Sequence, residues 1–391
     1  MNTEDLPDLL YSDAERALTE SLNSLLADRF NLDKTLARTE SDQTYDEGLW
    51  HAVAGELGCA GLLIPEHDGG AGATYREAAS VAETLGAAVA PVPFVGSAVV
   101  ATTALLSVAS GAGQTQARAA TDLLRRMADG GATAALAAGF AGAPRTTFPF
   151  SVRLAGSRPG DTQAGVARLR GTVSGVADAL PAGLLLVPAE GVPAALYLVD
   201  VSAAGVAKAP VTSLDMTRQL CDLSFDDAPG TLIASGAAAT RAVGAALTAG
   251  AGMLAAEQVG LAQRCLDMTL AYTKQRHQFA RPVGSFQALK HRMADVWVGV
   301  TQARAASRYA AACLAAGLPD TDVAVAVAKA YCSEVAVRAA EECVQMHGGI
   351  GFTWEHPAHL YLKRAKADSL GFGTADAHRA ALAALVNLPA P

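Results

Sequence analysis

Charged and aromatic side chains are scarce in this sequence of 391 residues, at 17% and 5% of the chain, whereas 51% is hydrophobic. Such a chain is expected to fold around a large core and is long enough for two or three domains. The net charge is −8, and no segment is rich in Lys or Arg, which argues against nucleic acid as a partner. Polar residues interrupt every apolar run before the ~18 residues of a membrane span, so no membrane partner is expected.

Several common site patterns are also missing. The six cysteines are scattered without a Cys-x-x-Cys pair, which predicts buried thiols in a reducing compartment. The N-terminus is acidic, unlike a secretory or transit signal, so the predicted location is cytoplasmic. His356 and His359 have no third ligand at a suitable spacing, and no metal site is expected. Gly250 and Gly252 lie in an alanine-rich helical stretch without a preceding strand, which favours close helix packing over a dinucleotide fingerprint.

The periodicity of the apolar residues divides the chain into three parts. Helical spacing extends to about residue 128 and returns from Ala237 to the end. Between them, short segments separated by Gly, Pro and Asp predict strands near 133–137, 150–154, 167–171, 183–187 and 195–199. We therefore predict an α+β fold with an N-terminal helical bundle (1–130), a small central β-barrel domain (131–235) and a C-terminal helical bundle (236–391).

Two motifs near the C-terminal bundle suggest a phosphate-containing ligand. Around Arg276 and Gln278, Pro282 and Gly284 end one helix and Ser285 can cap the next. An arginine beside a helix N-terminus suits a pyrophosphate, although these charges also fit an ordinary surface turn. In the second motif, Gln345-Met346-His347-Gly348-Gly349, the side chains suit an adenine or a ribose. The two glycines are equally typical of a simple helix C-cap.

Taken together, the motifs resemble those of the acyl-CoA dehydrogenase family, across essentially the whole chain. The family pattern is Arg-x-Gln-Phe-Gly, Pro, Phe-Gln, Ala-Asp and then Gln-x-His-Gly-Gly-x-Gly. The chain departs from it at Ala280, where glycine is usual. The matching residues are Arg276, Gln278, Phe279, Pro282, Phe286, Gln287, Ala294, Asp295, Gln345, His347, Gly348, Gly349 and Gly351.

The resemblance implies a C-terminal four-helix bundle and an FAD-dependent α,β-desaturation of an acyl-CoA, with electron-transfer flavoprotein as the acceptor. A carboxylate removes the α proton and the flavin takes the β hydrogen. By position, Thr374 would contact the flavin of this chain's own site, and Arg379 either the CoA nucleotide or only solvent. The residues implied to hold the pyrophosphate and adenosine of a neighbouring subunit's FAD are Arg276, Gln278, Phe279, Gln287, Gln345, His347, Gly348 and Gly349.

The catalytic carboxylate of the family is missing from this chain. Its usual position, before Gly-Thr, holds Phe372, and the alternative position on the preceding long helix falls at about Gly250. Glu257 is about two helical turns from Gly250, too far to replace it. Asp368, about one turn before Phe372, remains a weak substitute. The expected catalytic set is therefore empty.

The segments that wall the flavin ring in the family are altered as well. The regions 137–143 and 171–176 lack the Thr-Glu-Pro, Gly-Ser-Asp and Trp-x-(Thr/Ser)-Asn signatures. The chain thus resembles the non-catalytic subunit of actinobacterial heteromeric (α2β2) acyl-CoA dehydrogenases of the steroid side-chain type. Two alternatives stay open, namely an active homo-oligomeric enzyme with a displaced base and a flavin-free scaffold or acyl-CoA-binding protein.

Overall fold

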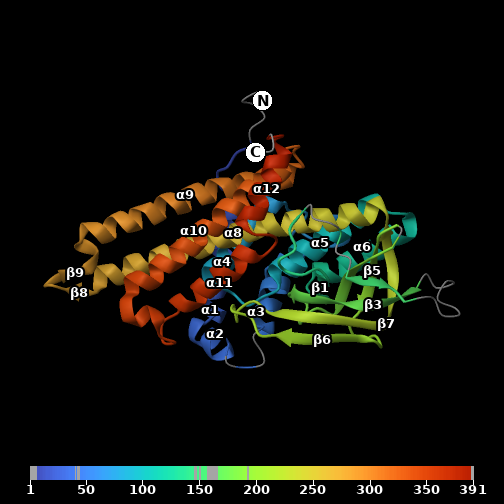
Figure 1. The fold of residues 1–391 in the computed structure, drawn as a ribbon, viewed down its shortest axis with the longest axis horizontal. Helices are drawn as coiled ribbons and strands as arrows, with labels where there is room; N and C mark the ends of the chain where they lie inside the picture. Colours follow the sequence, from blue (N-terminus) through green and yellow to red (C-terminus); the bar gives the residue numbers. More distant parts are fainter. Residues whose placement is uncertain are drawn as a thin grey trace.

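The computed structural model describes residues 7–39, 41, 45–144, 148, 151–155, 166–191 and 193–388. Within this part of the chain, helices come first, a sheet follows, and long helices complete the fold (Figure 1). The sheet lies at one end of the molecule, and the long C-terminal helices extend away from it towards the opposite end. This order confirms the predicted fold class.

The N-terminal helices begin at residues that satisfy their free N–H groups. Ser12 with Glu15, and Thr74 with Glu77, form capping boxes at the starts of two helices. Several short helical turns connect the longer elements. The N-terminal elements are α1 (Asp13–Arg29), α2 (Leu32–Thr39), α3 (Glu47–His51), η2 (Ala52–Glu56), η3 (Cys59–Gly61), η4 (Glu66–Asp68), α4 (Tyr75–Ala88), η5 (Phe94–Ala101), α5 (Thr102–Gly111) and α6 (Gln114–Ala128).

The central sheet has seven strands among the described residues, in the order β1-β4-β5-β7-β3-β2, and β6 also pairs with β7. Among the described strand pairs, β1 and β4 form the parallel ladder and the other ladders are antiparallel. The sheet curls so that β2 returns to the end of β4 through a single bridge between Arg153 and Glu190. The strands are β1 (Ala134–Leu136), β2 (Val152–Leu154), β3 (Val166–Ala177), β4 (Leu184–Ala189), β5 (Ala195–Asp200), β6 (Val206–Val211) and β7 (Leu220–Ser235).

The C-terminal part is built around one long helix, α8 (Ala237–Gln275), which packs against α4, α5, α9 and α10. Glycine allows the closest approach: a Cβ at Gly260 would lie 1.8 Å from the Glu83 carbonyl oxygen of α4. The remaining elements are β8 (His277–Gln278), β9 (Arg281–Pro282), η6 (Val283–Ser285), α9 (Gln287–Ala316), α10 (Thr321–His347), η7 (Gly348–Phe352), α11 (Ala358–Leu370) and α12 (Ala375–Leu385).

Two features differ from the sequence-based expectations. Strands β6 and β7 were not singled out, although β7 is 16 residues long, because Asp, Pro and Gly interrupt its pattern. Two helical stretches, Phe94–Gly111 and Ala237–Gln275, are long and apolar enough to cross a membrane, where none was expected. Both stretches are mostly buried inside the protein, as the core helices of a folded domain are.

Candidate functional site

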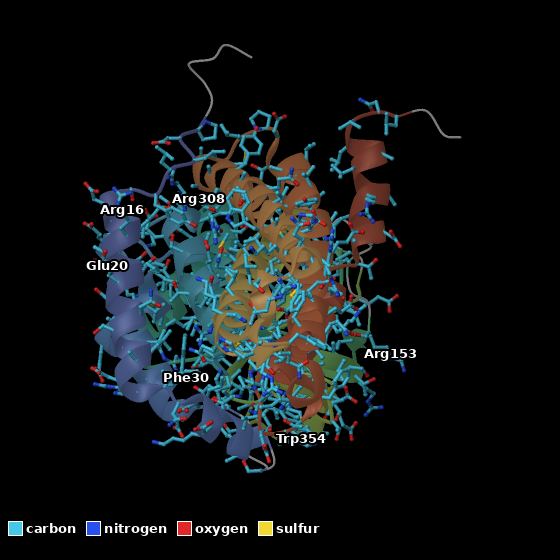
Figure 2. All side chains as sticks on the ribbon, turned by 90° about the vertical axis from the view of Figure 1, so that its left-hand side faces the viewer. Arg16, Glu20, Phe30, Arg153, Arg308 and Trp354 are labelled. Carbon is cyan, nitrogen blue, oxygen red and sulfur yellow. The ribbon has the colours of Figure 1, made fainter. Side chains whose placement is uncertain are left out.

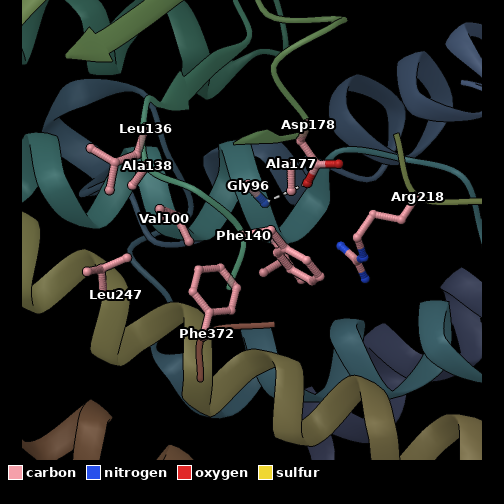
Figure 3. Close-up of a pocket in the computed structure, with 11 residues that line it drawn as sticks. Gly96, Val100, Leu136, Ala138, Phe140, Ala177, Asp178, Arg218, Leu247 and Phe372 are labelled. Atoms are coloured by element: carbon pink, nitrogen blue, oxygen red, sulfur yellow. Dashed lines mark hydrogen bonds between the residues drawn. The ribbon is translucent and has the colours of Figure 1, made fainter. Parts of the chain in front are cut away.

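Phe372 fills the position where the catalytic carboxylate was sought. It lies at the corner between α11 and α12 with a left-handed φ of +51°, and it is buried. Its ring meets Phe140 edge-on, with 5.5 Å between the ring centroids. On its other side lies Gly250, where a Cβ would be 2.8 Å from the Phe372 ring. The two positions at which a base was sought are therefore in direct contact, and neither carries one. Figure 3 shows Phe372 beside Phe140 at this place.

The backbone of this corner is tied to the β domain. The Phe372 N–H donates to the Phe140 carbonyl at 2.7 Å, and the Phe140 N–H donates to the Gly175 carbonyl at 2.8 Å. Phe140 and Gly175 belong to the two segments that lack the family's flavin-wall signatures. His378 Nε2 lies 2.9 Å from the Phe372 carbonyl. The two altered segments are thus bonded to each other, and one of them to Phe372. Gly250, which Phe372 contacts, lies 13 residues inside the start of α8, and we call this part of the helix the closed end of α8 because its surroundings are filled.

Lys329 of α10 forms hydrogen bonds with the same corner. Its side chain is fully buried, and Nζ donates to Ser333 Oγ at 2.8 Å and to the Asp368 and Gly373 carbonyls at 3.0 and 3.2 Å. Burial lowers the pKa of Lys329 to about 8, against a smaller opposing effect of Asp368. Because three acceptors surround the ammonium group, removing it would leave two backbone carbonyls without this donor.

Little space remains beside Phe372. A cavity of about 20 Å³ lies between η5, β1, α8 and the Phe372 corner, which is room for about one water molecule. Phe140, Phe372 and Arg218 occupy its walls, and the Arg218 guanidinium lies 5.3 Å from the Phe140 ring centroid (Figure 3). A flavin ring or an acyl thioester does not fit in this space.

Asp178 is the carboxylate that lines this cavity among the described residues. It adopts a left-handed φ of +57°, and its Oδ2 accepts a hydrogen bond from the Gly96 N–H at 2.9 Å. Burial raises the pKa of this carboxyl group, although the Arg218 charge acts in the opposite direction. Backbone strain of this kind is concentrated at functional sites. Asp178 was not among the residues identified from the sequence.

A buried ion-pair cluster supports the closed end. Glu257 Oε1 lies 2.5 Å from both Arg218 and Arg364, and Arg364 also lies 2.5 Å from Asp215. Burial opposes ionisation of Glu257, but the two arginines prevail and lower its pKa. Glu257 is therefore a paired structural carboxylate. The sequence offered no signal for this cluster, because its members lie far apart along the chain.

Asp368, the weak substitute for the base, is not among the residues that line the cavity beside Phe372. The residue is fully buried, and its two carboxyl oxygens have no hydrogen-bond partner among the described residues. Arg218 Nε lies 3.5 Å from Oδ1. Burial and the charge of Glu257 raise the pKa of Asp368 to about 8, so the carboxyl group is mainly protonated at neutral pH.

The other motif residues gather at the far end of α8, which we call the open end. It consists of the β8–β9 hairpin, the start of α9 and the Gln345–Gly349 turn, and the hairpin extends beyond the helices (Figure 1). Tyr272 in the last turn of α8 stacks on His347, which places the turn beside the hairpin. The sequence-predicted residues whose side chains or backbone are exposed here are Arg276, Gln278, Phe279, Gln287, Gln345, Gly348 and Gly349.

Polar and apolar groups at the open end are exposed and available to contact a ligand. A Cβ at Gly348 or Gly349 would meet nothing within 4 Å, and Phe279 is 85% exposed. The expected capping by Ser285 is wrong: α9 starts without a side-chain cap, and the Ser285 hydroxyl has no hydrogen-bond partner in the described part of the chain. The free N–H groups of this helix start can therefore bind an anion. These residues fit the pyrophosphate and adenosine end of a dinucleotide.

His347 does not lie on this surface. Only 3% of it is exposed, and Nδ1 lies 2.6 Å from the Cys343 carbonyl. Nδ1 of His347 is thus hydrogen-bonded inside the protein, which corrects the expectation of a side chain directed at the ligand. Thr374 is likewise used locally, because its hydroxyl caps α12 by accepting from the Ala377 N–H at 3.2 Å.

Arg379, the residue implied to lie near CoA, is on the exposed side of α12. Its guanidinium pairs with Glu334 at 2.5 Å and with Asp376 at 3.1 Å. It does not line the cavity at the closed end. The alternative interpretation, a charged outer helix face, describes this arrangement.

The closed and open ends are far apart. At a rise of about 1.5 Å per residue, the helix between Gly250 and Gln275 spans about 38 Å. The position of the missing base and the open end therefore lie at well-separated places along one helix.

Comparisons with known proteins give a consistent result. Models of the acyl-CoA dehydrogenase N-terminal and C-terminal domains match residues 12–132 and 240–386. The acyl-CoA dehydrogenase IpdE2 of Mycobacterium tuberculosis is 36% identical over 348 residues, which cover 89% of each chain. A variant of the steroid ACAD Tcur3481-Tcur3483 has a TM-score of 0.82 at 28% identity, covering 96% of this chain and 98% of that one. The ChsE4-ChsE5 complex from Mycobacterium tuberculosis has a TM-score of 0.84 at 25% identity, with coverages of 98% and 100%.

Proposed function

The chain belongs to the acyl-CoA dehydrogenase family of FAD-dependent oxidoreductases, and on this premise we propose that it is the non-catalytic subunit of an α2β2 complex. Its open end completes the FAD site of a catalytic partner subunit. That partner performs the α,β-desaturation of an acyl-CoA thioester, and electron-transfer flavoprotein accepts the electrons. When bound, FAD supplies the hydride acceptor.

The observation that carries this proposal is the separation of the two ends of α8. The residues suited to the adenosine end of FAD lie about 38 Å, by helical rise, from the position of the missing base. They face outward, whereas the cavity beside Phe372 holds only about 20 Å³. A subunit with this arrangement is suited to contribute to a neighbour's cofactor while binding no flavin ring of its own.

Each residue of the open end has a proposed role. Arg276, Gln287 and the uncapped start of α9 bind the pyrophosphate, since both the guanidinium group and free helix N–H groups suit phosphate oxygens. Gln278 and Phe279, on the protruding hairpin, contact the partner's side of the cofactor. Gln345, Gly348 and Gly349 contact the adenosine, whose approach the two glycines leave unobstructed.

The names of the similar proteins suggest the substrate class and the assembly. One similar structure is a steroid ACAD, and another is the ChsE4-ChsE5 complex. We therefore extend the proposal to a steroid-derived acyl-CoA and a heterotetramer. Exposed Trp297 and Val298 on α9 supply apolar surface of the kind found in subunit contacts. All six cysteines are free and buried, as suits the reducing cytoplasm.

Purification of the chain alone and together with a candidate catalytic subunit tests the proposal. We expect the chain alone to be colourless, and the co-expressed complex to be yellow and reducible by an acyl-CoA. Flavin should be present at one molecule per pair of unlike chains. A yellow protein that an acyl-CoA reduces without any partner would contradict the proposal.

Variants of the open end test the residue roles in the purified complex. Arg276→Ala and Gln345→Ala should each weaken FAD retention by about tenfold, corresponding to one charge-assisted or two ordinary hydrogen bonds. Arg118→Ala, an exposed arginine on α6, is the matched control and should leave flavin content unchanged. Unaltered flavin content in both test variants would contradict the assignment of the adenosine end.

One observation favours the alternative of an active enzyme with a displaced base. Asp178, unlike Asp368, lines the cavity beside Phe372. For this alternative, Phe372 would have to leave the cavity so that substrate and flavin could enter. Acyl-CoA-dependent flavin reduction by the chain alone, abolished in Asp178→Asn, would support it over the non-catalytic role.

A further inference from the structure

The Gly348–Gly349 turn rests on a stack of three rings. The His347 ring lies between Tyr272 and His356, with centroid distances of 4.5 and 4.3 Å. These rings come from the end of α8, the end of α10 and the segment before α11. We infer that this ring stack positions the turn for the adenosine end of FAD, with His347 as the central positioning residue. This inference rests on the proposed function of the open end.

Hydrogen bonds fix how the two histidines can carry their protons. His347 Nδ1 lies 2.6 Å from the Cys343 carbonyl, and because a carbonyl oxygen only accepts, Nδ1 carries the proton. His356 Nδ1 accepts from the Ala358 N–H at 3.2 Å, so its proton resides on Nε2 in the neutral ring. A hydrogen bond to the backbone therefore holds each of the two rings in one orientation.

The segment that follows the turn packs directly on His347, the residue that carries the middle ring. A Cβ at Gly351 would lie 3.1 Å from His347 Cβ and 2.6 Å from the Val344 carbonyl, so the chain after the turn passes close over α10. Gly348 has a φ of +62°, and the residues at the turn face open space. The exposed turn therefore begins directly after His347, whose ring is packed against Tyr272 and His356. Trp354 lies nearby in sequence, at the lower edge of the molecule in Figure 2.

The surroundings act in opposite directions on the two histidines. Burial, with the neighbouring charges of His347 and His359, lowers the pKa of His356 to about 4. Burial also opposes a charge on His347, but its hydrogen bonds with Cys343 prevail and raise its pKa. The other titratable groups nearby are Cys343, whose Sγ lies 3.7 Å from His347 Nδ1, Cys265 beside Cys343, and Lys363, which lies over the Trp354 ring and acts on His359.

The sign of the pH effect follows from His356. Its pKa in the folded protein is below the ordinary value of about 6.5. The stabilisation associated with its neutral ring is therefore present above about pH 6.5 and declines as the pH falls towards 4. His347 acts in the opposite direction, so the variant His356→Phe, which keeps a ring but cannot titrate, isolates the contribution of His356.

Binding of ADP-ribose to the full chain tests the inference, because its pyrophosphate does not titrate near neutral pH. His347→Ala, which removes the middle ring, should weaken binding by about tenfold or more, and His347→Phe, which keeps a ring, by about threefold or less. The control His51→Ala, at an exposed position on α3, should bind as the unmodified chain does. Circular dichroism of each variant verifies folding.

The outcomes separate the inference from the function on which it rests. If the unmodified chain binds no ADP-ribose, the proposed adenosine site itself fails. If the chain binds it and His347→Ala binds it equally well, only the positioning role is overturned. If His347→Ala does not fold, the outer ring decides: His356→Ala, which removes a ring beside His347, should weaken binding more than His356→Phe, which keeps one. Equal binding by these two variants would overturn the inference.

Discussion

The two ends of α8 differ in what meets the helix. At the closed end, side chains from α10, α11, the β domain and the α11–α12 corner fill the space and satisfy one another. At the open end, a hairpin and a glycine turn leave arginine, glutamine and aromatic groups facing outward. One helix can thus combine a packed core region with an unfilled ligand surface, because different tertiary contacts determine the two ends.

The largest contrast should come from removing one arginine at each end. Arg364→Met leaves Glu257 and Asp215 buried without this partner, and we expect it to lower the free energy of unfolding by about 3–5 kcal/mol. Arg276→Met at the open end replaces an exposed side chain and should change the free energy of unfolding by less than about 0.5 kcal/mol. Urea denaturation measures both. Equal effects would mean that the cluster does not stabilise the closed end.

A similar contrast applies to phenylalanine. Phe372→Ala removes a buried ring beside Gly250 and Phe140 and should cost about 3 kcal/mol of folding free energy. The enlarged cavity, lined by apolar side chains together with Asp178 and Arg218, should also bind a small aromatic molecule such as benzene, which raises the melting temperature. Phe279→Ala, at the exposed hairpin, is the control and should show neither effect. No loss of stability in Phe372→Ala would contradict its role as a packed core residue.

The pH dependence of stability sharpens the comparison further. Asp368 is held with a pKa of about 8, above the ordinary value of about 3.9, so the folded chain retains a proton that the unfolded chain has lost. Its contribution to stability is therefore present below about pH 4 and declines as the pH rises towards 8. The limiting slope is about 1.4 kcal/mol per pH unit.

The variant Asp368→Asn is uncharged at every pH and has nearly the same shape. The stability difference between this variant and the unmodified chain should increase in favour of the variant between pH 5 and 8. Chemical denaturation at several pH values measures this difference. A pH-independent difference would indicate that Asp368 is ionised in the folded state.

The smallest expected effect lies at the open end. Ala280 has a φ of +60°, where an L-residue with a Cβ is disfavoured by about 1–2 kcal/mol. Ala280→Gly removes this strain but increases the freedom of the unfolded chain by about 0.4–1 kcal/mol. We therefore expect a net stabilisation of about 0.5 kcal/mol, measurable as a small rise in melting temperature. A decrease would indicate that the Ala280 methyl group makes a stabilising contact.

Much of the fold was accessible from the sequence. Apolar periodicity predicted the long helices, including the one ending near Lys274, and the change to short segments indicated the sheet. The family resemblance also directed attention to Phe372 and Gly250. These features depend on local patterns or on short motifs, which a single sequence displays directly.

Contacts between residues that lie far apart in the sequence could not be predicted in the same way. Phe372 and Gly250 are 122 positions apart, and nothing near either indicates that they touch. Lys329 stands between alanines on α10, a signal of an unusual buried charge, but its acceptors on the α11–α12 corner are distant in sequence. The burial of His347 could not be predicted from its motif, which indicates a ligand-binding residue, because it depends on packing against Tyr272.

The contact between Phe372 and Gly250 has an evolutionary consequence. A glutamate introduced at position 250 would collide with the Phe372 ring, since even a Cβ there would lie 2.8 Å from it. A glutamate at position 372 would place a carboxylate beside Phe140, Asp178 and Arg218 in a cavity too small for substrate. Neither single substitution supplies a base with room for a substrate next to it. If the chain is the proposed non-catalytic subunit, the close packing of this pair means that several coordinated changes would be needed to regain an independent active site.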